Sequence, residues 1–322
     1  MISHFKPFLK VIIPLTIGVF FIYLSVHNTT SEEREIIYSY FKNADIRYVV
    51  ISMICGILSH FSRAYRWMFL LSPLGYRPSM ANTTLAVMVA YFANLGIPRS
   101  GEVLRATTLR TYEKIPFEKS FGTIVAERFI DLILLALFVV LAMFLQFNTI
   151  LPFIVESETD LYFSGMIILL LVGLFFLLRR LFKKSEITWI VKIKKVAASF
   201  WEGILSLKKM KKKIPFLLHT LFIWGMYFMM FYVIKYTVPE TYDLNFLELI
   251  PAFVVGGLTI SATNGGIGIY PFSVALVLST IPVPNEAGLA FGWIIWTTQT
   301  VLVIVFGSLS FFLLPLVNRK KS

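Results

Sequence analysis

Long apolar runs recur along the chain and alternate with short polar stretches. Six of these runs predict membrane-spanning helices, because a span needs about 20 mostly apolar residues. They are Val11–Val26, Tyr48–Leu71, Ser120–Phe147, Phe163–Leu178, Ile214–Tyr236 and Ala287–Leu314. Lys6 and Lys10 before the first run imitate a secretory signal, yet no small-residue cleavage site follows it. The pattern predicts an all-α polytopic membrane protein.

Two further apolar segments do not fit this alternation as simple crossings. If Met80–Ile97 crossed the bilayer, every later loop would carry the wrong sign of charge, and the pair Leu247–Ile260 and Tyr270–Ile281 raises the same problem. Each is therefore expected to be a re-entrant hairpin, turning near Asn94–Gly101 and near Asn264–Gly268. The residues expected in the turns are Gly96, Pro98, Gly101, Asn264, Gly265, Gly266 and Gly268. Irregular backbone at membrane depth needs protein or water around it, so both turns should line a shared cavity.

Charge in the loops then predicts the orientation. The 322 residues are 57% hydrophobic and carry a formal net charge of +12, and the charges are unevenly placed. Basic residues flank the first span at Lys6 and follow the second at Arg77, whereas acidic residues gather around Glu33 and Glu156 in loops on the other side. By the positive-inside rule we expect both termini in the cytoplasm, and we expect the protein to be integral to the cytoplasmic (inner) membrane.

This order of spans and hairpins also predicts an internal symmetry. Residues 1–147 would give span, span, hairpin, span starting from the cytoplasm, and residues 163–317 would give the same order starting from outside. An acidic outer loop would join the halves. Inverted repeats of this kind place a substrate site between their two broken elements.

Charged residues well inside one predicted span indicate a functional site. Glu127, Arg128 and Asp131 lie roughly 10–17 Å along a helix that begins near Ser120. Each buried ionisable group costs about 2.5–3.5 kcal/mol on insertion scales, so these groups are expected to face one another and a polar cavity. The alternative is an ion-pair cluster that only fixes helix packing.

Arginines near the first hairpin are the candidates for binding a lipid headgroup. The planar guanidinium binds phosphate oxygens in pairs. With the amide of Asn94, the candidates are Arg99, Arg105 and Arg128, and the backbone amides of a half-helix starting near Ser100–Glu102 could add donors. Glu102, Glu127 and Asp131 could pair with the arginines when no lipid is bound, or carry protons. For Arg99, Arg105 and Arg110 the alternative is an ordinary positive charge at the inner face.

Other polar residues are given structural interpretations. Arg63 and Arg66 with Trp67 suit interface anchors better than headgroup binding. His60 and His219 lack partners at metal-ligand spacing, so no metal site is assigned. No nucleotide-binding loop occurs, and no cofactor is expected. The glycines around Asn264 could also form a close helix-packing site.

A lysine-rich segment stands apart from the spans. Residues 183–213 interleave lysines with Trp189, Phe200 and Trp201. This composition suits an amphipathic helix on anionic lipids of the inner leaflet. A docking site for a soluble partner is the alternative, and nucleic-acid binding is not expected.

The ordered set of polar motifs resembles a known family. The motifs are Arg63-Ala-Tyr-Arg-Trp-Met-Phe-Leu-Leu, Pro73-Leu-Gly-Tyr-Arg-Pro, Tyr91-Phe-Ala-Asn, Pro98-Arg-Ser-Gly-Glu-Val-Leu-Arg and Glu127-Arg-Phe-Ile-Asp. Together they resemble the flippase-like transmembrane domain of lysylphosphatidylglycerol synthases, over nearly the whole chain. The resemblance implies movement of lipids between leaflets, and we expect a stand-alone member without the synthase domain. One departure is that Ile269-Tyr-Pro follows the glycines where the family often carries an acid.

The expected function is therefore translocation of a phospholipid or polyprenyl-phosphate lipid by binding and rocking, without covalent catalysis. Two alternatives stay open. A membrane glycosyltransferase-like enzyme would use a polyprenyl-phosphate lipid and need a catalytic carboxylate in a structured outer loop, whereas the outer acids around Glu33 and Glu156 lie in short polar loops. A non-transporting partner of envelope lipid synthesis would tolerate loss of Glu127 or Arg128. A homo-oligomer is compatible with all three.

Overall fold

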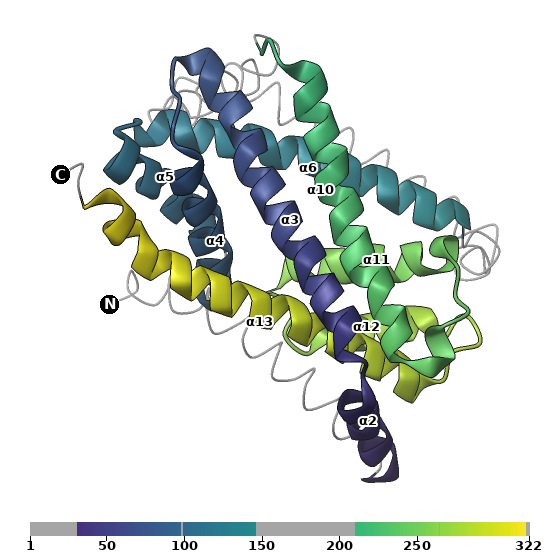
Figure 1. Ribbon diagram of the computed structural model, residues 1–322. Coiled ribbons are helices and arrows are strands. Elements are labelled where there is room, and N and C mark those ends of the chain that lie inside the picture. Colours follow the sequence, from purple (N-terminus) through teal and green to yellow (C-terminus); the bar gives the residue numbers. More distant parts are fainter. Residues whose placement is uncertain (1–30, 98, 146–209, 264, 320–322) are drawn as a thin grey trace, which may run out of the picture.

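The computed structural model describes residues 31–97, 99–145, 210–263 and 265–319 (Figure 1). These residues form nine α-helices, with short 3-10 turns and no strand, which confirms the all-α prediction. Four helices are long and apolar enough to cross a membrane. The predicted spans Val11–Val26 and Phe163–Leu178, the turn residues Pro98 and Asn264, and residues 183–209 lie outside the described ranges.

The four long helices occupy predicted spans. They are α3 (Ile46–Leu71), α6 (Phe117–Leu145), α10 (Lys213–Val233) and α13 (Asn285–Asn318). The start of α3 is fixed by Asp45, whose side chain accepts a hydrogen bond of 2.9 Å from the backbone N–H of Arg47. Such a cap satisfies a helix donor that would otherwise have no partner.

Two helix pairs stand where the hairpins are predicted. The first pair consists of α4 (Met80–Gly96) and α5 (Ser100–Glu113). The second consists of α11 (Phe246–Ala262) and α12 (Ile269–Leu278). The members of each pair pack against each other. The half-helix start expected near Ser100 is confirmed.

The turn glycines have separable roles. A side chain at Gly101 would collide with the backbone of Ala90, so this glycine lets α5 approach α4 closely. Gly265, Gly266 and Gly268 have φ angles of 64°, 77° and 71°, which glycine adopts without steric penalty. A side chain at Gly96 would meet open space, so this position needs glycine neither for close packing nor for a positive φ.

The tips of the two helix pairs meet. A β-carbon at Gly265 would lie 3.0 Å from the Cδ2 atom of Leu95, at the end of α4. Trp296 of α13 donates a 2.8 Å hydrogen bond from its indole N–H to the carbonyl oxygen of Gly265. The contact supports the expectation that both turns border one region.

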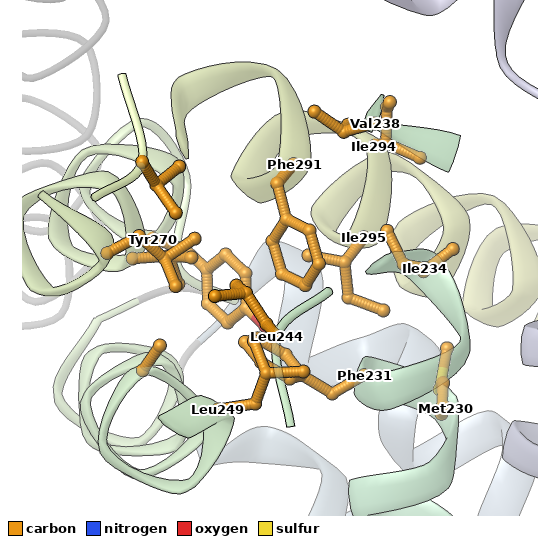
Figure 2. Packing of buried hydrophobic residues seen from close by; sticks show 14 of the residues in the cluster. Met230, Phe231, Ile234, Val238, Leu244, Leu249, Tyr270, Phe291, Ile294 and Ile295 are labelled. Atoms are coloured by element: carbon orange, nitrogen blue, oxygen red, sulfur yellow. The ribbon is translucent and has the colours of Figure 1, made fainter. Parts of the chain in front are cut away.

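The helices pack across the two halves of the chain. α3 lies against α10, α4 against α13, and α6 against α11. A large apolar cluster joins α10 to α13; its labelled side chains in Figure 2 include Phe231, Leu249, Tyr270, Phe291 and Ile295. The rings of Phe231 and Phe291 are 4.9 Å apart. Lipid tails are as apolar as these side chains, so close packing contributes more to such contacts than the hydrophobic effect does.

One end of the helix bundle is basic. The N-terminus of α10 meets the C-terminus of α3 there, because Lys212 Nζ lies 5.8 Å from the ring centre of Phe69. We call this the basic end and define it by Arg77, Lys114 and Lys212, which follow or precede helices that end there.

A polar network closes the basic end. Glu113 at the C-terminus of α5 accepts hydrogen bonds through Oε1 from Ser79 Oγ (2.7 Å) and Asn82 Nδ2 (2.6 Å) at the N-terminus of α4. Asn82 and Asn318 of α13 exchange two side-chain hydrogen bonds of 2.8 and 2.9 Å. The network joins the first helix pair to the end of α13.

The opposite end is acidic, and one prediction about it is wrong. The residues around Glu33 were expected in a polar loop, but residues 31–43 form a helix, α2 (Ser31–Asn43). This helix packs against α13, and Tyr40 donates a 2.6 Å hydrogen bond to Glu240. Ile37 and Tyr40 pack onto the core, so tertiary contacts stabilise a helix that the charges of this segment alone did not predict.

Candidate functional site

Two arginines of α3 and two carboxylates of α6 face each other inside the protein. Arg63 Nη1 lies 2.7 Å from Glu127 Oε1 and 2.6 Å from Asp131 Oδ2. Arg66 Nη1 lies 3.0 Å from Asp131 Oδ1, and it also donates to Thr220 of α10 at 2.9 Å. The spacing of Arg63 and Arg66 along α3, and of Glu127 and Asp131 along α6, puts each pair on one helix face.

Arg105 of α5 adds a third guanidinium. It pairs with both oxygens of Glu127, at 2.9 Å from Nη2 to Oε2 and 3.2 Å from Nη1 to Oε1. The guanidinium carbon lies 3.9 Å from the ring centre of Trp67, whose N–H donates to Thr123 Oγ1 at 2.9 Å. Arginine stacks on aromatic faces in this way while its N–H groups bind elsewhere.

We call Arg63, Arg66, Arg105, Glu127 and Asp131 the arginine cluster. All five are at most 8% exposed. Three positive and two negative groups leave a formal charge of +1. Burying such charges destabilises a protein unless each is paired, and removing one partner leaves another uncompensated.

A fourth arginine lies at the edge of the arginine cluster. The side chain of Arg128 is 42% exposed, and its Nη2 lies 3.1 Å from Oε1 of Glu102, whose side chain is 22% exposed. The other carboxylate oxygen of Glu102 is buried and has no hydrogen-bond partner within the described part of the chain. This pair is therefore the accessible part of the charged region.

A pocket opens between α4, α5 and α6. Its enclosed volume is about 10 Å³, and the empty space reaches about 220 Å³ only when the part open to the outside is included. The lining joins the exposed pair to the buried cluster. It consists of Val87, Ala90, Tyr91, Asn94, Glu102, Arg105 and Arg128.

Aromatic and polar side chains of three helices continue the wall behind Tyr91. Its hydroxyl lies 2.8 Å from that of Tyr227 on α10. The ring of His60 on α3 is 4.3 Å from the ring of Tyr91, and Arg63 lies over Tyr227 at 5.8 Å. Within the described residues no group of three or more His, Cys, Asp or Glu side chains could hold a metal ion.

The outer faces of the helices that form the pocket are apolar. Phe92 on α4, Val103 and Leu104 on α5, and Phe129 on α6 are 37–47% exposed. Phe129 directly follows Arg128, so one turn of α6 presents a charge to the pocket and an aromatic ring to the outside. A polar interior beside an apolar exterior suits an amphipathic ligand.

The structure brings together some candidates and separates others. Arg105, Arg128 and Glu102 line the pocket, as does Asn94, whose Oδ1 also accepts a 2.8 Å hydrogen bond from the N–H of Gly101. Arg99 is exposed at the tip of the first helix pair, has a φ of 60°, and is not part of the pocket lining. Of the acids expected to pair with these arginines, Glu102 pairs with Arg128 and Glu127 with Arg105, whereas Asp131 pairs with Arg63 and Arg66 instead.

The interface-anchor interpretation of Arg63, Arg66 and Trp67 is wrong. All three are at most 2% exposed, and both arginines form buried ion pairs. A signal was available in the sequence. Arg63 and Arg66 share one face of a span, and Glu127 and Asp131 share one face of another, so the two pairs are complementary.

Comparison with known proteins agrees with the resemblance of the motifs. Residues 11–307 match the family described as the lysylphosphatidylglycerol synthase TM region. A UPF0104 membrane protein of Methanocaldococcus jannaschii is 35% identical over 92 residues, which are 28% of this chain and 27% of that protein. Glycosyltransferase AglD of Haloferax volcanii is 30% identical over 95 residues, 29% of this chain and 15% of that protein. Both alignments thus span under a third of the relative's length. No solved structure matches.

Proposed function

Since the chain belongs to the family of the lysylphosphatidylglycerol synthase TM region, we propose that it is a lipid translocase that moves a phosphate-containing lipid between leaflets. The observation that carries the proposal is the pocket between α4, α5 and α6, where Arg128 and Arg105 border a space beside an apolar outer face. A headgroup would occupy the pocket while the acyl chains stay in lipid.

The charge of the site favours an anionic group. The arginine cluster carries a formal +1, and within the described ranges Arg128 pairs with one carboxylate, that of Glu102. A phosphate could replace Glu102 as the partner of Arg128, and guanidinium binds phosphate strongly. The N-terminus of α5, next to the pocket, adds a partial positive charge.

The packing supports an inverted repeat. α3, the α4–α5 pair and α6 correspond in order to α10, the α11–α12 pair and α13. The first pair opens toward the basic end and the second toward the opposite end, and their tips meet at Leu95 and Gly265. In this arrangement the site lies beside the broken elements, where transporters of this type bind substrate.

The basic and acidic ends of the helix bundle imply an orientation in the membrane. Positively charged loops face the cytoplasm, so the basic end, with Arg77, Lys114 and Lys212, would be cytoplasmic and the chain would lie in the inner membrane with both termini inside. Reporter fusions after Arg77 and after Glu240 test this. The first reporter should be active only in the cytoplasm and the second only outside.

Lipid movement in proteoliposomes tests the function. A panel of fluorescent lipids would be followed with a quencher that cannot cross the membrane. The wild-type chain should move at least one phosphate-containing lipid faster than protein-free vesicles, and Arg128→Ala should slow it about tenfold or more, as expected for loss of a charge-assisted hydrogen bond.

Arg110→Ala is the matched control, because Arg110 is an exposed arginine in the last turn of α5, outside the pocket. It should leave the rate near that of the wild type. Absence of movement for every lipid, with the protein folded, would contradict the translocase proposal and favour a non-transporting partner of lipid synthesis.

A second candidate function is that of a glycosyltransferase-like enzyme on a polyprenyl-phosphate lipid. Its support is the similarity of part of the chain to glycosyltransferase AglD of Haloferax volcanii. Incubation with polyprenyl-phosphate sugars and analysis of the lipid products separates the two candidates. Sugar transfer that depends on Arg128, without lipid movement, would favour the enzyme.

A further inference from the structure

Only one of the two carboxylate oxygens of Glu102 has a partner within the described residues. Glu102 lies in the first turn of α5 and lines the pocket. Oε1 is 3.1 Å from Arg128, whereas Oε2 is buried and has no hydrogen-bond partner within the described residues. A buried acceptor of this kind is normally satisfied, so its state points to a donor that binds there.

Binding a phosphate at Arg128 changes the surroundings of Glu102. The guanidinium of Arg128 has donors to spare, because its Nε is buried without a hydrogen-bond partner within the described residues. A phosphate bound there lies beside the carboxylate of Glu102, whose side chain is only 22% exposed. The two anions repel each other, and Glu102 Oε2 still lacks a partner. A ligand that offers only phosphate therefore binds less tightly than one that also offers a donor.

A headgroup that also carries a hydrogen-bond donor avoids this penalty. Its phosphate binds the guanidinium of Arg128, and its N–H or O–H donates to Oε2 of Glu102. Both charged side chains then have a partner on the ligand. Tertiary amines protonated at neutral pH and hydroxyls can supply the donor, whereas a quaternary ammonium has no N–H.

We infer that Glu102 determines headgroup specificity, selecting lipids whose headgroup carries an N–H or O–H donor beside the phosphate. The inference rests on the proposed function, because it requires the lipid headgroup to enter this pocket. Ethanolamine-type and glycerol-type headgroups carry such a donor and belong to the selected class, whereas choline-type headgroups do not.

A methylation series separates donor recognition from charge. Binding to the full chain in detergent would be measured for phosphatidylethanolamine and its mono-, di- and trimethylated forms. Only the last methyl group removes the final N–H, so affinity should change little over the first two steps and fall about tenfold or more at the third. An equal decline at every methyl group would show selection by size and overturn the inference.

Two variants test whether Glu102 causes the fall in affinity at the third methyl group. Glu102→Ala should bind the dimethylated and trimethylated lipids equally. Glu118→Ala removes an exposed acid of α6 outside the pocket and should show the same fall in affinity as the wild type. A step that persists in Glu102→Ala would overturn the assignment. Phosphatidylglycerol then tells whether hydroxyl donors suffice: its binding should also weaken in Glu102→Ala.

Transport of the same lipids distinguishes this inference from the proposed function. Movement of all four lipids at one rate, with no step in binding, keeps the translocase and overturns the selectivity. A step in binding without movement of any lipid keeps the selectivity and overturns the translocase. Absence of binding for every lipid overturns the inference.

Discussion

Arg105 and Glu127 form a two-point ion pair that joins α5 to α6, with contacts of 2.9 and 3.2 Å. Both side chains are at most 2% exposed. The pair therefore fixes the first helix pair to the long helix that carries the rest of the charged site. A lysine in place of Arg105 would supply one charge without the second contact.

Loss of either partner should destabilise the protein, but not equally. Glu127→Ala should lower the free energy of unfolding by about 3–5 kcal/mol, because it leaves three buried arginines facing one carboxylate. Arg105→Ala should cost less, because Glu127 keeps its contacts with Arg63 and Arg66. Unfolding in detergent, followed by heat or denaturant, measures this. The double variant should lose less than the sum of the two single losses. Strictly additive losses would contradict direct coupling between the pair.

Two glycines of the first helix pair should differ sharply on substitution by alanine. Gly101→Ala places a methyl group against the backbone of Ala90 and should force α5 away from α4, with a loss of about 1–3 kcal/mol. Gly96→Ala meets open space at the end of α4 and should change stability by less than about 0.5 kcal/mol. Thermal unfolding of both variants is the measurement. Equal effects would mean that the close approach at Gly101 contributes nothing.

Arg99 combines an exposed side chain with a strained backbone. Its φ of 60° lies in the left-handed region, which costs a residue with a side chain roughly 1–2 kcal/mol. Arg99→Gly should therefore raise stability by up to about 1 kcal/mol. Because Arg99 lies outside the pocket lining, the rate of lipid movement should not change. A slower rate in this variant, with stability raised, would restore Arg99 as a headgroup contact.

The contact between Tyr40 and Glu240 predicts a dependence on alkaline pH. Burial, followed by the hydrogen bond to Glu240, raises the pKa of Tyr40 to about 12. The folded state thus favours the protonated phenol, so its contribution is full below pH 10 and is lost as the pH rises toward 12. Tyr40→Phe should reduce stability by less than about 1 kcal/mol at pH 8.

The difference in stability between the wild type and Tyr40→Phe should shrink between pH 10 and 12. Comparing the unfolding temperatures of the two proteins at pH 8 and pH 11.5 measures this. Tyr38→Phe is the control, because Tyr38 is a largely exposed tyrosine of the same helix. A difference for Tyr40→Phe that stays constant up to pH 12 would contradict the assigned hydrogen bond.

Long apolar runs predicted the long helices well, because a membrane-spanning segment must satisfy its backbone hydrogen bonds internally and is therefore helical. The bounds of α3 and α13 differ from the predicted ones by only a few residues. The turns were predictable for a different reason. Glycines at Gly265 and Gly268 marked a chain reversal, and both have the positive φ angles that favour glycine.

The site was predictable only in part. Glu127 and Asp131 stood out because charge at the middle of a span has few explanations. Arg63 and Arg66 lie near the end of theirs, where anchoring at the interface is the more common explanation of arginine. Their match to the acid pair of α6 becomes decisive only once the two spans are known to be neighbours, which the fold shows. Likewise, the exposure that separates Arg128 from Arg105 depends on how α5 packs, which no local pattern specifies.

The reciprocal amide pair between Asn82 and Asn318 has a practical meaning for engineering the protein. Asn318 is 6% exposed, although it is the last residue of α13. A fluorophore or affinity tag attached at this residue would compete with its bonds to Asn82 and disturb the first helix pair. Attachment after Arg319 leaves the amide pair in place, so paired labels at that position and on the α4–α5 tip could report the distance between them during lipid movement.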